Sequence, residues 1–189
     1  HALIELELLT LPNALQTGFS SVQNRSLLCN ALISALEELH DLQQKPIPVD
    51  VSDGAATAAE DNTPLHSELL SYFILLHADE PQTMLTELAR APQAVQSHNA
   101  TTRALHVCAA YGREDIAGFQ RAASCCTILE VSCLLRLLPS VRAAALQQAN
   151  SAYIAREAVP TAGLCPRLLL SDPADATRCA ASHGLTHDP

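Results

Sequence analysis

Residues 63–77 read TPLHSELLSYFILLH, and this stretch decides the fold class of the chain. Proline suits the first turn of a helix, where its missing N–H would have no partner, so Thr63 and Pro64 indicate a helix start with Thr63 as the cap. Apolar side chains then recur at helical spacing along one side of the stretch, namely Leu65, Leu69, Leu70, Phe73 and Leu76, followed by His77. We therefore predict an amphipathic helix here.

The same spacing occurs on the N-terminal side. In residues 24–44, Leu28, Leu32, Leu36 and Leu39 recur at steps of four and three, which predicts a second amphipathic helix. Residues 46–63, in contrast, are rich in Pro, Asp and small side chains, a composition typical of a loop. Because so long a loop is unusual within a compact domain, we interpret it as an insertion.

Proline and glycine divide the chain downstream into short helices. Pro81 and Pro92 each suit a helix start, which predicts helices over residues 82–90 and 93–98. Residues 101–111 are expected to form a helix that Gly112 ends as a C-cap, and residues 113–123 a weaker one.

Residues 125–138 are apolar on nearly every face, which predicts the central buried helix of the fold. We expect Pro139 to end that helix and Ser140 to cap another that runs to about residue 157. A short apolar unit over residues 163–170 and a helix over residues 173–183, closed by Gly184, follow. This rhythm of helix pairs predicts an all-α fold, an α-solenoid of helix pairs.

Composition agrees with a helical protein. Hydrophobic residues make up 48% of the 189 residues, but there is no Trp and there are only three Phe and three Tyr. Leu and Ala, which dominate the apolar residues, favour helices, whereas strands favour aromatic and β-branched side chains.

The net charge of −9 is concentrated in the first half of the chain. Residues 1–100 hold 3 Lys and Arg against 13 Asp and Glu, and residues 101–189 hold 8 against 7. The first half should therefore repel phosphate, and any nucleic-acid contact must come from arginines of the second half. There is also no run of 18 or more uncharged apolar residues, so we predict no membrane span.

The seven cysteines are an odd number scattered over apolar stretches, which favours a reducing compartment. We interpret Cys125, Cys126 and Cys133 as buried thiols, because structural zinc usually requires more closely paired ligands. Cys179 and His183 lie four residues apart, but the sequence offers too few further ligands nearby for a zinc site. His77 and His106 lie on or beside apolar faces and are interpreted as core or capping histidines.

No catalytic motif occurs in the sequence. A nucleophile elbow, a phosphate-binding glycine loop, a zinc-protease motif and a dinucleotide turn are all missing, and adjacent carboxylates such as Glu37 and Glu38 point apart on a helix. We therefore predict no catalytic residue, no cofactor and no metal. A hydrolase whose motifs lie in missing sequence is the least favoured alternative, and it stays open because the chain begins at His1 without Met, which we interpret as a fragment of a longer product.

An ordered set of motifs resembles the SAC3/GANP family, a branch of the PCI-like proteins. A helix with Asn24, Arg25 and Cys29 ends in a Leu-x-x-Leu-His-Asp run, and Glu68, Leu75 and Leu76 belong to an E-x-x-x-Y-x-x-L-L helix. The later positions are Leu134, Leu135, Arg142, Leu146 and Tyr153, followed by an H-G-L run at Gly184 and Leu185. Together these motifs extend over residues 24–185, and the stretch from Pro64 to Leu185 resembles the family as a whole.

This resemblance implies a right-handed helical stack over residues 1–157 and an incomplete winged helix over residues 158–189. It also implies a scaffold without enzymatic activity, in assemblies that link transcription to mRNA export at the nuclear pore. The implied partners are another PCI-type subunit, a small acidic subunit and nuclear-pore proteins, and the implied location is the nucleus, at the nuclear envelope.

Two other assignments remain open for such a domain. One is an adaptor at the centrosome or spindle, and the other is a PCI subunit of a proteasome-lid or translation-factor assembly, which would place the chain at the centrosome or in the cytoplasm. If the winged helix forms, Arg167 and Arg178 are the candidates for phosphate contact, whereas we interpret Arg142 as a structural partner of a helix C-terminus or carboxylate.

Overall fold

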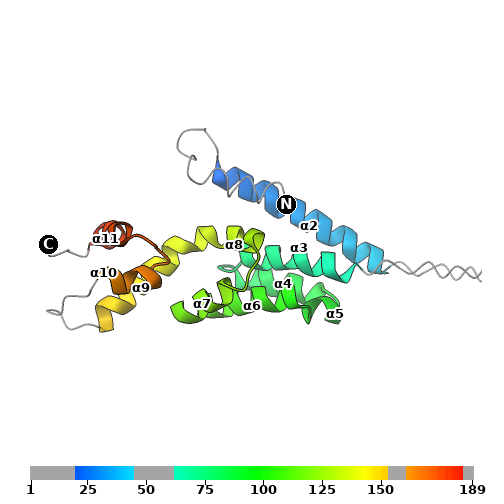
Figure 1. The fold of residues 1–189 in the computed structure, drawn as a ribbon. Coiled ribbons are helices and arrows are strands. Elements are labelled where there is room, and N and C mark those ends of the chain that lie inside the picture. The colour runs from blue at the N-terminus through cyan, green and yellow to red at the C-terminus, as the bar shows by residue number, and fades with distance from the viewer. Residues whose placement is uncertain (1–19, 45–61, 153–160, 185–189) are drawn as a thin grey trace, which may run out of the picture.

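The computed structural model describes residues 20–44, 62–152 and 161–184, and these residues are helical with no strand among them (Figure 1). The helices are α2 (Ser21–Gln44), α3 (Thr63–Leu76), α4 (Pro81–Arg90), α5 (Gln93–Gln96), α6 (Asn99–Gly112), α7 (Ile116–Ala123), α8 (Ile128–Leu134), the 3₁₀ turn η1 (Leu135–Leu137), α9 (Leu138–Ala152), α10 (Thr161–Arg167) and α11 (Pro173–Ser182). The all-α fold class is thus confirmed for the described residues. Most of the expected insertion at 46–63 lies outside them.

The central helix is α3, which packs against α2, α4, α5, α6 and α8. Its side chains are buried on almost every face in its second half, from Leu70 to Leu76. The prediction that residues 125–138 form the central buried helix was wrong. That stretch is divided among a turn, α8, η1 and the first residue of α9, and Ile128 at the start of α8 is 74% exposed.

Prolines mark the helix starts as expected. α3 and α4 carry Pro64 and Pro81 in their first turns, and Pro92 is the N-cap residue of α5. Fixed backbone geometry and the missing donor make proline compatible with these positions. The cap of α3 is displaced by one residue, because Asn62 occupies the N-cap position and Thr63 is already helical.

The connection from α6 to α7 differs from the prediction. Gly112 is the last residue of α6 and not a left-handed C-cap, and Glu114 instead takes the positive φ of 53°. Asp115 then caps α7, where its side chain accepts a hydrogen bond of 2.8 Å from the Gly118 amide. The turn therefore depends on a carboxylate cap more than on glycine.

The connection from α8 to α9 runs through η1 without a break. Pro139 lies in the first turn of α9, so it does not end the preceding helix in the way we expected, and Ser140 is inside α9 and does not cap it. A proline can occupy this position because a first-turn N–H needs no helical partner. The cap that organises this region is Thr127, which forms a reciprocal capping box with Glu130 at the start of α8.

Two cores hold the helices together. The main one joins the helices from α2 to α8, η1 and the start of α9. A smaller one joins Ala145 and Leu146 of α9 to Cys165, Leu168 and Ala176 at α10 and α11. In Figure 1, α10 and α11 lie beside α9, at the opposite end of the molecule from α4 and α5. The boundary predicted at residue 157 lies outside the described residues.

Candidate functional site

Two arginines converge on the C-terminal end of α3. Arg136 of η1 donates to the carbonyl oxygen of Leu76 and to both carboxylate oxygens of Asp79, with 2.8 Å from Nη1 to Oδ2. Arg25 of α2 donates to the same Leu76 carbonyl at 3.2 Å and lies 3.5 Å from Glu80. Cations suit the carbonyl end of a helix, so this group joins three helical segments.

A buried carboxylate connects α8 to the centre of the fold. Glu130 is 2% exposed, and Arg103 of α6 donates to its two oxygens at 3.0 and 3.4 Å. Its Oε2 also accepts from the Thr127 amide at 2.6 Å, and Ser71 of α3 donates to Oε1 at 3.4 Å. A buried charge needs this degree of pairing, so Glu130 serves the structure and is not free to act as a general base.

The family-motif residues that the structure describes lie mainly in the cores. Leu75, Leu76, Leu134 and Leu146 are buried, Leu135 is half-buried, and Glu68 accepts a hydrogen bond of 2.6 Å from the Tyr72 hydroxyl. Arg142 Nε donates to the Leu168 carbonyl at 2.9 Å, just after the C-terminus of α10, and Gly184 has a φ of 79°. Tyr153 and Leu185 lie outside the described residues.

The two arginines expected to contact nucleic acid lie on different helices. Arg178 of α11 pairs with Asp175 one turn earlier, and Arg167 is exposed at the end of α10. The pairing reduces the charge that Arg178 could offer to a phosphate. Their role in nucleic-acid binding stays a prediction.

Burial holds two of the cysteines in the thiol form. Burial raises the pKa of Cys108 to about 12 and that of Cys126 to about 11, so both thiols stay protonated at neutral pH. The interpretation of Cys125 as a buried thiol was wrong, because it lies exposed in the turn between α7 and α8. Cys133 is buried and Cys126 half-buried.

The histidines His77 and His106 differ in burial. His77 is the buried C-cap residue of α3, with Nδ1 at 2.9 Å from the Phe73 carbonyl, whereas His106 is exposed and belongs to no core. Within residues 20–44, 62–152 and 161–184, no group of three or more potential metal ligands comes together.

Exposed apolar side chains lie on both flanks of α2. Val22 and Ile33 are 79% and 40% exposed, and Leu27 and Leu42 are 53% and 55% exposed. At 3.6 residues per turn, Val22 and Ile33 lie on one flank of the buried Leu28–Leu36 face, and Leu27 and Leu42 lie on the other. The leucine spacing in the sequence indicated only the buried face. The exposed residues on the two flanks could have been found as the apolar residues of α2 that do not follow that spacing.

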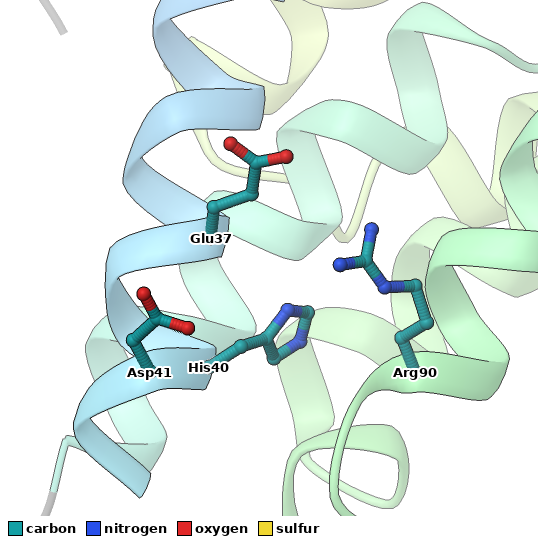
Figure 2. Close-up of a pocket in the computed structure, with 4 residues that line it drawn as sticks. All are labelled: Glu37, His40, Asp41 and Arg90. Atoms are coloured by element: carbon teal, nitrogen blue, oxygen red, sulfur yellow. The ribbon is translucent and has the colours of Figure 1, made fainter. Parts of the chain in front are cut away.

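A polar pocket opens beside the C-terminal half of α2. Glu37, His40 and Asp41 line it from α2 and Arg90 from α4, with a volume of about 500 Å³ (Figure 2). Sequence reasoning missed this pocket, because only the packing of α2 places its side chains opposite α4.

Within the described part of the chain, no helix has both the length and the hydrophobicity that a membrane span requires.

No curated protein and no solved structure matched the chain. The SAC3/GANP family, however, matches residues 1–189, the whole of the sequence. The chain therefore belongs to the SAC3/GANP family, whose domains are generally non-catalytic scaffolds that work within larger complexes.

Proposed function

We propose that this chain is a non-catalytic scaffold that couples transcription to mRNA export at the nuclear pore through protein–protein contacts. The observation that carries the proposal is the family match over residues 1–189. Two groups among the described residues support it, because Glu130 is held in an ion pair with Arg103 and burial raises the pKa of the Cys108 thiol to about 12.

The exposed flanks of α2 are the proposed protein-binding surface. Monomeric proteins expose single apolar side chains commonly, but four large ones on one peripheral helix provide a ready contact. A standard interface of about 1,600 Å² needs only about 20 to 30 residues from each partner, which a helix of this length and its neighbours can supply.

We also propose a division of the chain into two structural units. Residues 1–157 would form a right-handed solenoid, and residues 158–189 would begin a winged helix. The small core that joins α9, α10 and α11 supports a compact C-terminal unit, with Arg142 tying α9 to the residue after α10.

The proposed partners are another PCI-type subunit, a small acidic subunit and nuclear-pore proteins, in the nucleus. Any RNA contact in this chain would be weak and would use Arg167 and Arg178. A salt titration tests that contact, because phosphate binding must weaken steeply as salt rises.

Affinity purification of the tagged chain from cells tests the scaffold function. We expect recovery of a PCI-type partner together with nuclear-pore proteins. Recovery of centrosomal proteins alone would remove the export role and favour a centrosome or spindle adaptor, and recovery of proteasome-lid or translation-factor subunits would favour those assemblies.

A pair of matched variants tests the α2 surface in the same purification. Leu27→Asp places a charge in an exposed apolar position and should reduce partner recovery at least fivefold. Gln147→Asp adds the same charge on an exposed position of α9 and should leave recovery unchanged. Equal recovery with both variants would show that this flank of α2 does not bind.

A further inference from the structure

The pocket between α2 and α4 is built around a buried histidine. His40 is 7% exposed, and neither of its ring nitrogens has a hydrogen-bond partner among the described residues. Figure 2 shows its ring between Asp41 on the same helix and Arg90 on α4, with Glu37 one turn away along α2. Because neutral imidazole has one N–H donor and one acceptor nitrogen, this ring can still make two hydrogen bonds.

The charges around His40 are predominantly negative. Glu37 and Asp41 are four residues apart on α2 and therefore share a face, and neither forms an ion pair with a described residue. Among the described residues that line the pocket, Arg90 is the one cation, and Glu87 already pairs with it at 3.1 Å. Glu87 also lies 3.8 Å from His40 Nδ1.

His66, whose ring packs against the His40 ring, adds no positive charge at neutral pH. The rings of His40 and His66 meet edge to face, with centroids 4.9 Å apart. Burial, together with the neighbouring His40, lowers the pKa of His66, so His66 is neutral at pH 7. Among the described residues, the carboxylates of Glu37 and Asp41 are therefore the charges left without a counterpart.

We propose that this pocket binds a Lys or Arg side chain of a partner protein. The carboxylates of Glu37 and Asp41 receive the cation, and the acceptor nitrogen of His40 accepts one of its N–H groups. An Arg side chain fits best, because the guanidinium fork can donate to a carboxylate and to the imidazole at the same time. The inference rests on the proposed scaffold function, and it names the chemistry of one contact.

A peptide titration followed by NMR tests the proposal. The probe is the blocked peptide acetyl-Gly-Gly-Arg-Gly-Gly-amide, and the readout is the imidazole proton signal of His40 at pH 7, assigned with the His40→Gln variant. We expect a saturable shift of that signal. The same peptide with citrulline in place of Arg keeps the shape but loses the charge, and it should bind at least tenfold more weakly.

Matched variants on α2 separate the pocket from general surface charge. Glu37→Gln and Asp41→Asn should each weaken binding of the Arg peptide at least fivefold. Glu38→Gln removes the same charge from an exposed neighbour outside the pocket and should have no effect. Circular dichroism of each variant checks that the helices are intact.

Several results would overturn the proposal. They are no shift with the Arg peptide, equal binding of the citrulline peptide, equal weakening by Glu38→Gln, or a preference for a peptide with Asp in place of Arg. The last result would instead assign an anion site to Arg90. The titration uses no cellular partner, so loss of partners in the purification with a normal titration would overturn the export role and leave the pocket in place.

Discussion

At the scale of single residues, Asp79 shows how one side chain couples two helical segments. Arg136 holds this carboxylate through both terminal guanidinium nitrogens, Nη1 and Nη2, and this hydrogen bonding lowers the pKa of Asp79 to about 2, from an ordinary value of 3.8. The same arginine also donates to the last carbonyl of α3. The pair thus fixes the orientation of η1 against the end of α3.

The depressed pKa predicts a pH dependence for the Asp79→Asn variant. The folded-state pKa lies below the unfolded one, so the contribution to stability is complete above about pH 4 and is lost as the pH falls toward 2. Because the Asp79 side chain is 40% exposed, solvent screening limits the loss in Asp79→Asn to about 1 kcal/mol at pH 7. Urea unfolding at pH 7, 5 and 3 should show the gap to the wild type narrowing at pH 3.

Asp175→Asn is the control for this variant. Asp175 has a similar exposure of 43% but pairs with Arg178 on its own helix, one turn away. Asp175→Asn should lower the free energy of unfolding by less than about 0.5 kcal/mol, as is usual for an exposed pair within one helix. A gap for Asp79→Asn that does not change with pH would contradict the prediction.

At the scale of helical elements, the end of α6 makes Gly112 replaceable. A Cβ added at Gly112 would meet no atom within 4 Å, and Gly112 is helical and not left-handed. Gly112→Ala should therefore raise the free energy of unfolding by about 0.4–1 kcal/mol, because alanine loses less backbone freedom on folding. Thermal and urea unfolding measure this change.

Gly118 is the contrasting case within α7. A Cβ there would lie 2.2 Å from Asp115 Oδ2, so Gly118→Ala should force that carboxylate out of its capping position. We expect the free energy of unfolding to fall by about 1 kcal/mol, the usual contribution of an N-cap. If Gly112→Ala were the destabilising variant of the two, Gly112 would have to be a true C-cap.

The start of α8 gives a second prediction for elements. Thr127→Ala removes the hydroxyl that accepts from the Glu130 amide, and it should lower the free energy of unfolding by about 1 kcal/mol. Ser140→Ala makes the same class of change inside α9, where the residue is exposed and caps nothing, and it should change stability by less than about 0.5 kcal/mol. Urea unfolding of both variants checks the difference, and equal losses would restore Ser140 as a cap.

At the scale of the whole molecule, the two cores should differ in stability. The small core has five buried members among the residues that the structure describes, so α10 and α11 depend there on few apolar contacts beyond Leu168. Small cores open locally at lower free energy than the centre of a fold. We therefore expect α10 and α11 to exchange their amide hydrogens faster than α3 and α6.

Leu168→Ala tests this division. Leu168 is fully buried, and its truncation should cost about 2–5 kcal/mol in the stability of the small core. Hydrogen exchange should then accelerate in α10 and α11 while α3 keeps its protection. Leu169→Ala, at an exposed neighbouring position, is the control, and equal loss of protection in α3 would show that the two cores unfold as one unit.

Local signals in the sequence were sufficient for most helix starts. Pro64, Pro81 and Pro92 mark starts correctly because a proline acts within a single turn. The helical spacing of Leu28, Leu32 and Leu36 likewise identified the buried face of α2. The errors at Gly112, Pro139 and Ser140 have a common cause: each residue type suits two positions of a helix end, and packing selects between them.

By itself, the sequence determined the helical class, the absence of catalytic motifs and the family to which the chain belongs, because composition, spacing and motif order do not depend on distant contacts. Only the tertiary structure decided that α3 is central and that Arg136 closes its end. It alone placed His40 of α2 and Arg90 of α4 around one pocket. The physical reason is that these arrangements depend on how whole helices pack together, which no short stretch of the chain encodes.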